Sequence, residues 1–305
     1  MGTPTFRTAV VRVPNGPDSI EFIDRPLREP GPGEIRVRVA AAPVNPVDLA
    51  VAAGFFHGIG VIDQPEHTGL GWDFSGTVEA VGEGVDLAVG TRVAGLVGGL
   101  DRDFGTYAEQ LVVPAADVAE VPEGQDLAAV STVPLNGLTA AQLVDLLGDA
   151  PQQGNRLLVT GAAGAVGGYV VTLAQERGWR VTGLARSADE EFVRGLGADF
   201  TDREIGGWDA VADAAALQER GRDLVRDGGV FVGVQPVSPI APERGIDLRA
   251  VNVVPDGARL ADLLARTAAG ELPTRVHAVV PLADAADAHR SFAKGGIRGR
   301  YVLQP

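Results

Sequence analysis

The chain has 305 residues, of which 45% are hydrophobic and 22% charged, as is typical of a globular protein large enough for two domains. It contains no cysteine, which excludes disulfides, cysteine-ligated zinc and a cysteine nucleophile. The net charge of −14 disfavours binding to nucleic acid or to an anionic membrane. The first residues form no apolar run, and no stretch approaches the roughly 20 apolar residues of a membrane span, so we expect a cytoplasmic protein.

The first third of the chain predicts a compact β-rich domain. It is rich in valine, glycine and proline, and β-branched segments alternate with glycine and proline turns. Strands are predicted at residues 8–13, 34–41, 76–81, 92–96 and 107–113. Short strands separated by glycine-rich turns are typical of a barrel-like domain.

Strands and helices alternate in the middle of the chain. The predicted order is helix 126–148, strand 156–160, helix 169–178, strand 180–185 and helix 188–196, then strands at 210–213, 229–234 and 250–254. Repeated strand–helix–strand units predict an α/β fold with a Rossmann-type, doubly wound parallel sheet. Helices at 258–269 and 283–294 and short strands at 275–280 and 300–303 complete the chain.

A glycine-rich turn joins the strand at 156–160 to the next helix. Its sequence is close to the dinucleotide-binding fingerprint, with an alanine where one glycine usually stands: Gly161-Ala162-Ala163-Gly164-Ala165-Val166-Gly167. Glycines let the backbone approach a pyrophosphate, and the helix N-terminus presents N–H groups to its phosphates. The strand, turn, helix and second strand together favour a dinucleotide site over a purely structural turn.

The end of the strand at 180–185 indicates which dinucleotide is bound. NAD-specific sites place an acidic residue there for the ribose 2′-hydroxyl, whereas this strand ends in Ala185, Arg186 and Ser187. A guanidinium and a hydroxyl suit a 2′-phosphate, because both can donate hydrogen bonds to it. We therefore predict NADPH as the cofactor. The alternative is that Arg186 is a solvated surface side chain.

Further motifs run nearly from end to end of the chain. They are Ala42-Pro43-Val44-Asn45-Pro46-Val47-Asp48, Gly71-Trp72-Asp73-Phe74-Ser75-Gly76, Gly105-Thr106-Tyr107-Ala108-Glu109, Leu196-Gly197-Ala198-Asp199 and Arg298-Gly299-Arg300-Tyr301-Val302-Leu303. With the glycine turn, this set resembles the medium-chain dehydrogenase/reductase superfamily, in its quinone reductase and enoyl reductase branch. The resemblance implies a barrel-like (GroES-like) catalytic domain, residues 1–122 and 255–305, and a dinucleotide-binding domain, residues 123–254.

The resemblance also implies site residues. Asn45 and Asp48 would be catalytic-site residues beside the nicotinamide and its ribose, and the alternative for them is an Asx-turn around Pro46. Thr139 would contact the nicotinamide ribose or a phosphate. The backbone of Gly233 and Val234 would hold the carboxamide.

Three basic residues are further candidates for the 2′-phosphate. They are Arg203, Lys294 and Arg298, and the alternative for each is a solvated surface charge. Phe55, Phe56 and Trp72 are candidates to line a substrate pocket, with core packing as the alternative.

No metal is expected. Zinc-dependent members of the superfamily need a Gly-His-Glu segment and cysteines, whereas the matching segment here is Gly71-Trp72-Asp73 and cysteine is absent. The histidines lack paired spacing. Without zinc, hydride transfer is easiest to an acceptor that is already polarised, so we expect reduction of a quinone or an α,β-unsaturated carbonyl, with the proton supplied by water.

Two other functions stay open at this stage. The chain could bind NADPH in a structural or sensing role, or serve as a pathway-specific enoyl reductase. A homodimer is also expected, because the predicted strand at 250–254 is apolar and would lie at a sheet edge.

Overall fold

The computed structural model describes residues 4–235 and 237–305, and the chain divides into two compact units. The first unit comprises Met1–Leu135 and Val254–Pro305, and the second comprises Asn136–Val253. The first unit extends beyond the predicted boundary at residue 122, because helix α3 (Leu127–Val130) packs against its strands and the carbonyl of Leu127 accepts a 2.7 Å bond from Ser75. The roles predicted for the two parts of the chain stay predictions.

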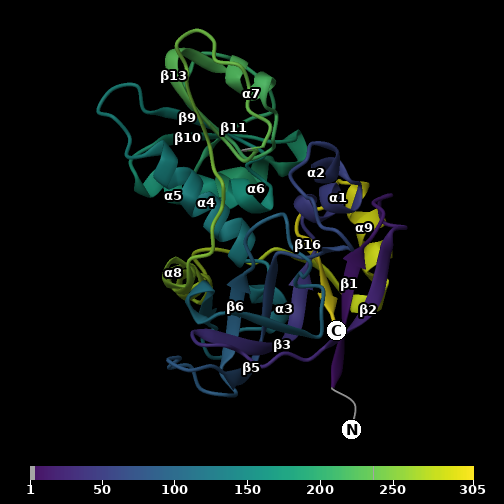
Figure 1. The fold of residues 1–305 in the computed structure, drawn as a ribbon. Coiled ribbons are helices and arrows are strands. Elements are labelled where there is room, and N and C mark those ends of the chain that lie inside the picture. Colours follow the sequence, from purple (N-terminus) through teal and green to yellow (C-terminus); the bar gives the residue numbers. More distant parts are fainter. Residues whose placement is uncertain (1–3, 236) are drawn as a thin grey trace. The chain divides into compact units, whose positions relative to one another are not determined.

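The first unit is built on two sheets. A three-stranded sheet has the order β2 (Ile20–Pro26), β1 (Thr5–Val11) and β4 (Thr68–Gly69). A seven-stranded sheet has the order β15 (Val276–Pro281), β16 (Arg300–Gln304), β3 (Glu34–Pro43), β5 (Asp73–Val81), β6 (Arg92–Leu96) and β8 (Val118–Glu120), with β7 (Gln110–Pro114) also paired to β3. The yellow C-terminal strand β16 therefore lies beside the purple β3 in Figure 1.

The side-chain pattern of β3 explains how this sheet forms a core. Ile35, Val37 and Val39 are buried, whereas Arg36 and Arg38 between them are more exposed, because successive side chains of a strand point to opposite faces. The other helices of the unit are α1 (Pro46–Ala52), α2 (Phe55–Gly58), α8 (Gly257–Ala268) and α9 (Ala285–Ala293), with 3-10 turns at Ala115–Asp117 and Leu282–Asp284.

The second unit contains one sheet whose strands are all parallel. The order is β11 (Asp199–Thr201), β10 (Arg180–Leu184), β9 (Arg156–Thr160), β12 (Trp208–Asp213), β13 (Val225–Gly233) and β14 (Asp247–Ala250). Strand order reverses between β9 and β12, and ligands of such sheets bind outside the carboxyl ends of the strands at this switch point. The α/β fold class is confirmed.

The second unit is completed by helices and an apolar core. The helices are α4 (Pro134–Leu147), which begins in the first unit, α5 (Ala165–Glu176), α6 (Glu190–Gly195) and α7 (Glu219–Asp223), with a 3-10 turn at Ser187–Asp189. Leu158, Val211 and Phe231 belong to one buried cluster beneath them. One helical stretch, Leu127–Leu147, is long and apolar enough to cross a membrane, but 72% of its most apolar window is buried, as in a core helix.

Two predicted elements are wrong. The helix predicted at 126–148 is broken before Pro134, because proline lacks an N–H group and disfavours helical backbone in the residue before it. The strand predicted at 250–254 lies earlier, at β14, and residues 251–254 are irregular. Strand β14 is the sheet edge and carries an Asp247–Arg249 ion pair, so the edge is charged instead of apolar.

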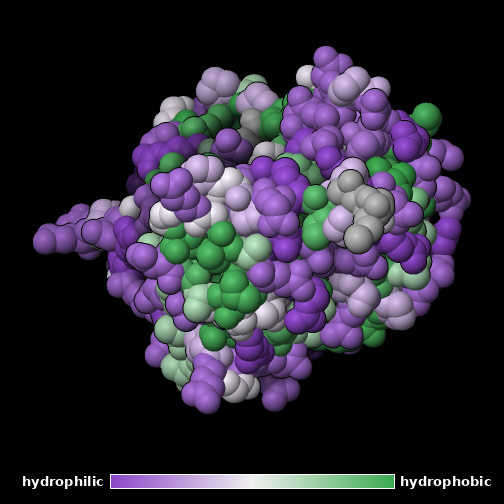
Figure 2. Space-filling model, turned by 60° about the horizontal axis from the view of Figure 1, so that its bottom comes forward, coloured by the Kyte–Doolittle hydropathy of each residue, from purple (hydrophilic) through white to green (hydrophobic). Residues whose placement is uncertain are grey.

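The surface fits the acidic composition. On the face drawn in Figure 2, hydrophilic residues predominate and apolar side chains gather in separate patches. Large apolar side chains that are exposed come from distant parts of the sequence, for example Val13, Val89 and Ile205.

Candidate functional site

The glycine turn lies at the carboxyl end of β9, beside the switch point. Gly161 has a φ of +60°, which favours glycine, and its carbonyl accepts a 2.8 Å bond from the N–H of Gly164. Gly167 must also be glycine, since a Cβ there would lie 2.2 Å from the Gly161 oxygen. The helix that follows starts at Ala165, earlier than predicted, so the turn and the first helical turn form one structure.

This turn fits a dinucleotide pyrophosphate. Gly164 is the N-cap of α5 and carries no side chain, so no side-chain oxygen occupies the first N–H groups of the helix. Such N–H groups and the positive end of the helix dipole attract an anion. The predicted residues Ala162, Ala163, Ala165 and Val166 all lie in this turn or in the first turn of α5.

The carboxyl end of β10 carries Ala185, Arg186 and Ser187, as predicted. However, the structure also brings two carboxylates there. Nε of Arg186 donates a 2.8 Å bond to Asp189, and the hydroxyl of Ser187 donates a 2.8 Å bond to Asp202. The Arg186 side chain is 59% exposed and that of Asp189 only 3%. Asp189 therefore binds one edge of the Arg186 guanidinium, and the rest of the Arg186 side chain is exposed to solvent.

At the switch point, a hydrogen-bonded pair of side chains that was not predicted from the sequence joins the ends of β9 and β12. Thr160 ends β9 and Asp213 ends β12, and the Thr160 hydroxyl donates a 2.6 Å bond to Asp213. The second carboxylate oxygen of Asp213 accepts a 2.8 Å bond from the N–H of Gln218, whose φ is +58°. Both residues end strands that pair side by side, which is the signal that could have identified them.

The other residues predicted for the cofactor are spread over the second unit. Gly233 ends β13, its carbonyl accepts a bond from Val251, and Val234 follows it. Thr139 is buried in α4. Arg203 follows β11 and is exposed, with its backbone N–H bonded to the Thr201 hydroxyl. Their contacts with a cofactor stay predictions.

In the first unit, Asn45 is completely buried and its side chain is bonded on both sides. Nδ2 donates a 2.8 Å bond to Asp73 at the start of β5, and Oδ1 accepts a 2.9 Å bond from Nε of Arg300 at the start of β16. These partners are far away in the sequence. Asn45 also makes local contacts, since Nδ2 donates a 3.4 Å bond to the Pro43 carbonyl and the residue is the N-cap of α1 in a capping box with Asp48.

The Asp48 carboxylate accepts hydrogen bonds from backbone N–H groups near it. One carboxylate oxygen accepts a 2.9 Å bond from the N–H of Asn45, and the other accepts a 2.9 Å bond from the N–H of Gly71. The residue is completely buried, and burial raises its pKa to about 6 despite these two bonds, which act to lower it. Asp48 thus fixes the local backbone and also shares a side-chain hydrogen bond with Tyr107, and its predicted place in the catalytic site stays a prediction.

Asp73 adds a second buried carboxylate next to the first. Its other oxygen accepts a 3.2 Å bond from the N–H of Leu135 at the start of α4. Burial, followed by the nearby charge of Asp48, raises the pKa of Asp73 to about 8. In the sequence, Asp73 stands out only as part of the motif Gly71-Trp72-Asp73-Phe74-Ser75-Gly76.

Tyr107 and His289 complete the buried polar region. The Tyr107 hydroxyl lies 3.2 Å from Nε2 of His289, and both side chains are completely buried. Burial, followed by the charge of Asp48, raises the pKa of Tyr107 far above its usual value. Burial lowers the pKa of His289 to about 4. A tyrosine so held is a poor source of a proton at neutral pH.

Trp72 stands where zinc-dependent members of the superfamily are expected to place a ligating histidine, and its side chain is buried in the core. The Arg102 guanidinium lies 4.7 Å from its ring centre and donates a hydrogen bond to the carbonyl of Gly71. Phe56 is also buried, whereas Phe55 is partly exposed. Among residues 4–235 and 237–305, no group of three His, Cys, Asp or Glu side chains could hold a metal ion.

Lys294 and Arg298, the remaining candidates for the 2′-phosphate, are exposed residues of the first unit, between α9 and β16. The predicted contact between them and a cofactor held by the second unit stays a prediction.

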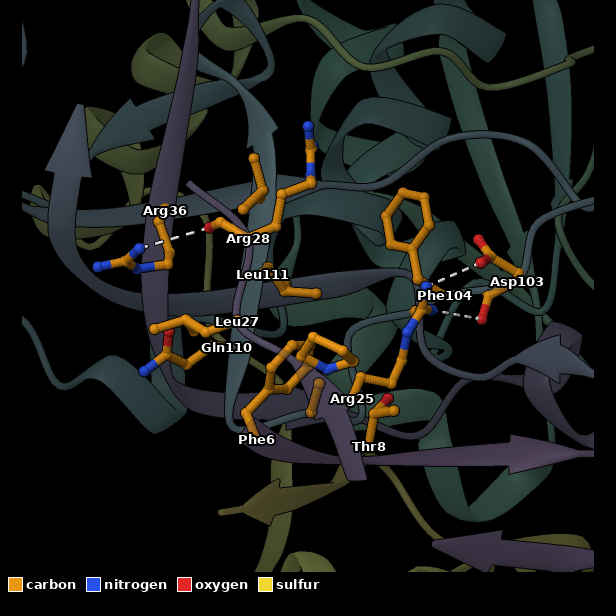
Figure 3. Close-up of a pocket in the computed structure, with 14 residues that line it drawn as sticks. Phe6, Thr8, Arg25, Leu27, Arg28, Arg36, Asp103, Phe104, Gln110 and Leu111 are labelled. Carbon is orange, nitrogen blue, oxygen red and sulfur yellow. Dashed lines mark hydrogen bonds and ion pairs between the residues drawn. The ribbon is translucent and has the colours of Figure 1, made fainter. Parts of the chain in front are cut away.

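The first unit also has a cavity of about 580 Å³ between its sheets, drawn in Figure 3. Phe6, Leu27, Phe104 and Leu111 form its apolar wall. Arg25 at its edge donates two bonds to Asp103. None of the site residues predicted from the sequence lines this cavity.

Two family models match the chain. One is described as an alcohol dehydrogenase GroES-like domain and matches residues 31–123. The other is described as a zinc-binding dehydrogenase and matches residues 185–303. Together they cover more than half of the chain.

Curated relatives include free-standing and modular proteins. The chain is 28% identical to a 2-haloacrylate reductase from Burkholderia sp, over 97% of this chain and 98% of that protein. It is 32% identical to the polyketide synthase GfsB from Streptomyces halstedii, over 91% of this chain. The chain spans only 4% of the length of the pikromycin polyketide synthase component PikAII from Streptomyces venezuelae and 5% of that of GfsB.

Solved structures share the fold over nearly the whole chain. The quinone oxidoreductase from Coxiella burnetii has a TM-score of 0.88 at 22% identity, covering 99% of this chain and 100% of that one. An NAD-dependent alcohol dehydrogenase has a TM-score of 0.82 at 30% identity, covering 98% of this chain and 99% of that one.

Proposed function

The chain belongs to the medium-chain dehydrogenase/reductase superfamily, and we propose that it is an NADPH-dependent reductase that transfers a hydride to a quinone or an α,β-unsaturated carbonyl without zinc. It is an oxidoreductase of that superfamily, whose dehydrogenases bind a nicotinamide cofactor. The observation that carries the proposal is the glycine turn and open N-terminus of α5, followed by Arg186 and Ser187 at the end of the next strand.

The cofactor would be held by residues of the second unit. The turn from Gly161 to Gly167 fits the pyrophosphate, and the dipole of α5 favours its charge. The exposed Arg186 side chain keeps donors beyond the one that Asp189 occupies, and these suit a 2′-phosphate. Ser187 would have to share its hydroxyl with Asp202. Bound NADPH would supply the hydride.

The absence of zinc is proposed from the sequence. The chain has no cysteine, and Trp72 occupies the position where zinc-dependent members place a histidine. Oxidation of a simple alcohol requires loss of its hydroxyl proton, which a metal normally assists. A conjugated acceptor already carries an electrophilic carbon, and its enolate or hydroquinone takes a proton from water. The buried Tyr107 does not compete for that role.

The activities for which relatives are named support this substrate class. Reductases of 2-haloacrylate and of quinones act on conjugated acceptors. The matches to polyketide synthases, together with a match to the trans-enoyl reductase thnE of Trichoderma harzianum, favour a second candidate, a pathway-specific enoyl reductase. The two candidates share the hydride chemistry and differ only in the acceptor.

The test is consumption of NADPH against quinones, simple enones and enoyl thioesters, with NADH measured beside it. We expect turnover with NADPH and a conjugated acceptor, and negligible oxidation of simple alcohols with NADP⁺. The acceptor with the highest kcat/KM decides between the two candidates. Tight NADPH binding with no turnover across the whole panel would refute a reductase and leave a structural or sensing NADPH-binding protein.

A further inference from the structure

Three residues from distant parts of the chain meet in the first unit around one side-chain amide. Asn45 follows β3, Asp73 begins β5 and Arg300 begins β16. The amide of Asn45 donates to Asp73 at 2.8 Å and accepts from Arg300 at 2.9 Å. Asn45 and Asp73 are completely buried, and the Arg300 guanidinium also lies 5.3 Å from the ring centre of Phe292.

These two bonds define the orientation of the amide. An asparagine side chain has a donor end and an acceptor end, and here each end faces a group of the opposite kind. A flip of the amide would point its NH₂ group at the Arg300 donor and its oxygen at the Asp73 carboxylate, and would lose both bonds. Because the site is buried, water cannot replace them.

The same carboxylate reaches a second element. Asp73 also accepts the N–H of Leu135, at the N-terminal end of α4, where the helix dipole favours negative charge. Asp73 therefore links Asn45 to the start of the helix that carries Thr139 into the second unit.

The hydrogen bonds around Asn45 depend on whether Asp73 is ionised, and this changes with pH. The groups around it are Asp48 from α1, Tyr107 before β7, Arg300 from β16 and the Leu135 N–H of α4. Burial and the charge of Asp48 raise its pKa to about 8. An ionised carboxylate accepts the Asn45 and Leu135 bonds more strongly than a neutral acid, so the arrangement tightens as the pH rises through that value.

We infer that Asp73 and Arg300 are positioning residues for the proposed hydride transfer, because together they hold the Asn45 amide in one orientation. This inference rests on the proposed function and on the family resemblance, which implies that Asn45 lies beside the nicotinamide. Neither residue needs to touch the substrate or cofactor for this role.

The experiment compares Asp73→Asn and Arg300→Met with matched controls on the full chain. Asp209→Asn removes a carboxylate held by Arg156 and Arg226, and Arg290→Met removes an arginine paired with Asp18 on the surface. With NADPH and 1,4-naphthoquinone, we expect kcat to fall about 10-fold to 100-fold in the test variants, with KM changing little. Arg300→Lys, which keeps one donor, should recover part of kcat, and both controls should match the wild type.

A pH profile of kcat and NMR of the Asn45 side chain distinguish a positioning role of Asp73 from a loss of folding in its variant. In the wild type, kcat should rise through pH 8 as Asp73 ionises, and the side-chain amide resonance of Asn45 should shift with the same midpoint. Both changes should be absent in Asp73→Asn, provided that its unfolding midpoint shows a folded protein.

Two results would overturn the inference in distinguishable ways. An active wild type whose test variants behave like the controls overturns the positioning role and leaves the proposed function standing. A wild type that turns over no conjugated acceptor, while its Asn45 amide still titrates near pH 8, overturns the proposed function and reduces the arrangement to a structural one. If Asp73→Asn fails to fold, Arg300→Met against Arg300→Lys decides on the same kcat criterion.

Discussion

Replacing Arg186 by alanine should selectively weaken the binding of NADPH. The side chain is 59% exposed, and its Nε donates a hydrogen bond to Asp189. The two terminal nitrogens of the guanidinium therefore stay available to bind a 2′-phosphate. A hydrogen bond to a charged group contributes about 1.5–3 kcal/mol, and solvent screening at this exposure favours the lower end. The expected loss is therefore about 1.5 kcal/mol, which is about 10-fold in Kd.

The assay is titration of each cofactor by calorimetry for the wild type, Arg186→Ala and Arg194→Ala. Arg194 is a suitable control, because it is a similarly exposed arginine paired with Glu190 on the next helix. NADH, which has no 2′-phosphate, should bind Arg186→Ala and the wild type with similar Kd values. Equal affinity of the wild type for NADPH and NADH, or an equal loss of both in Arg186→Ala, would refute the assignment of Arg186.

Three further predictions can be checked on the purified protein. Elemental analysis should find no stoichiometric zinc, and chelators should leave activity unchanged; one equivalent of zinc would overturn the interpretation of Trp72. Burial lowers the pKa of His289 to about 4 from the usual 6.5, so between these values the unfolded chain binds a proton that the folded protein does not. The free energy of unfolding should therefore decrease as the pH falls through this window, and urea titrations should show a smaller decrease for His289→Gln; an unchanged slope would contradict this. Light scattering should show a dimer at micromolar concentration, although the charged β14 edge gives this expectation less support than the apolar edge predicted from the sequence, and a monomer would exclude it.

Local patterns determined much of the fold and the cofactor turn. The strand at Arg156–Thr160 was predicted with its observed bounds, because a short apolar run before a glycine-rich turn leaves few alternatives. The requirement for glycine at Gly161 and Gly167 follows from backbone geometry that any such turn must adopt. Strand β2 was not predicted, because apolar and polar residues alternate only weakly in it and it is stabilised by pairing with β1.

Only the tertiary structure decided what the polar residues of the motifs do. Asp189 and Asp202 look like ordinary acidic residues in the sequence. The bond from Arg186 to Asp189 is local to the 3-10 turn after β10, whereas the bond from Ser187 to Asp202 depends on how β10 and β11 pair. Asn45 was predicted as a site residue with a local Asx-turn as the alternative, and the sequence did not indicate that its side chain joins Asp73 and Arg300 across 28 and 255 positions. Sequence periodicity reports which face of an element is buried, but hydrogen-bond partners are fixed by sheet register, and register is a property of strands that meet only in the folded chain.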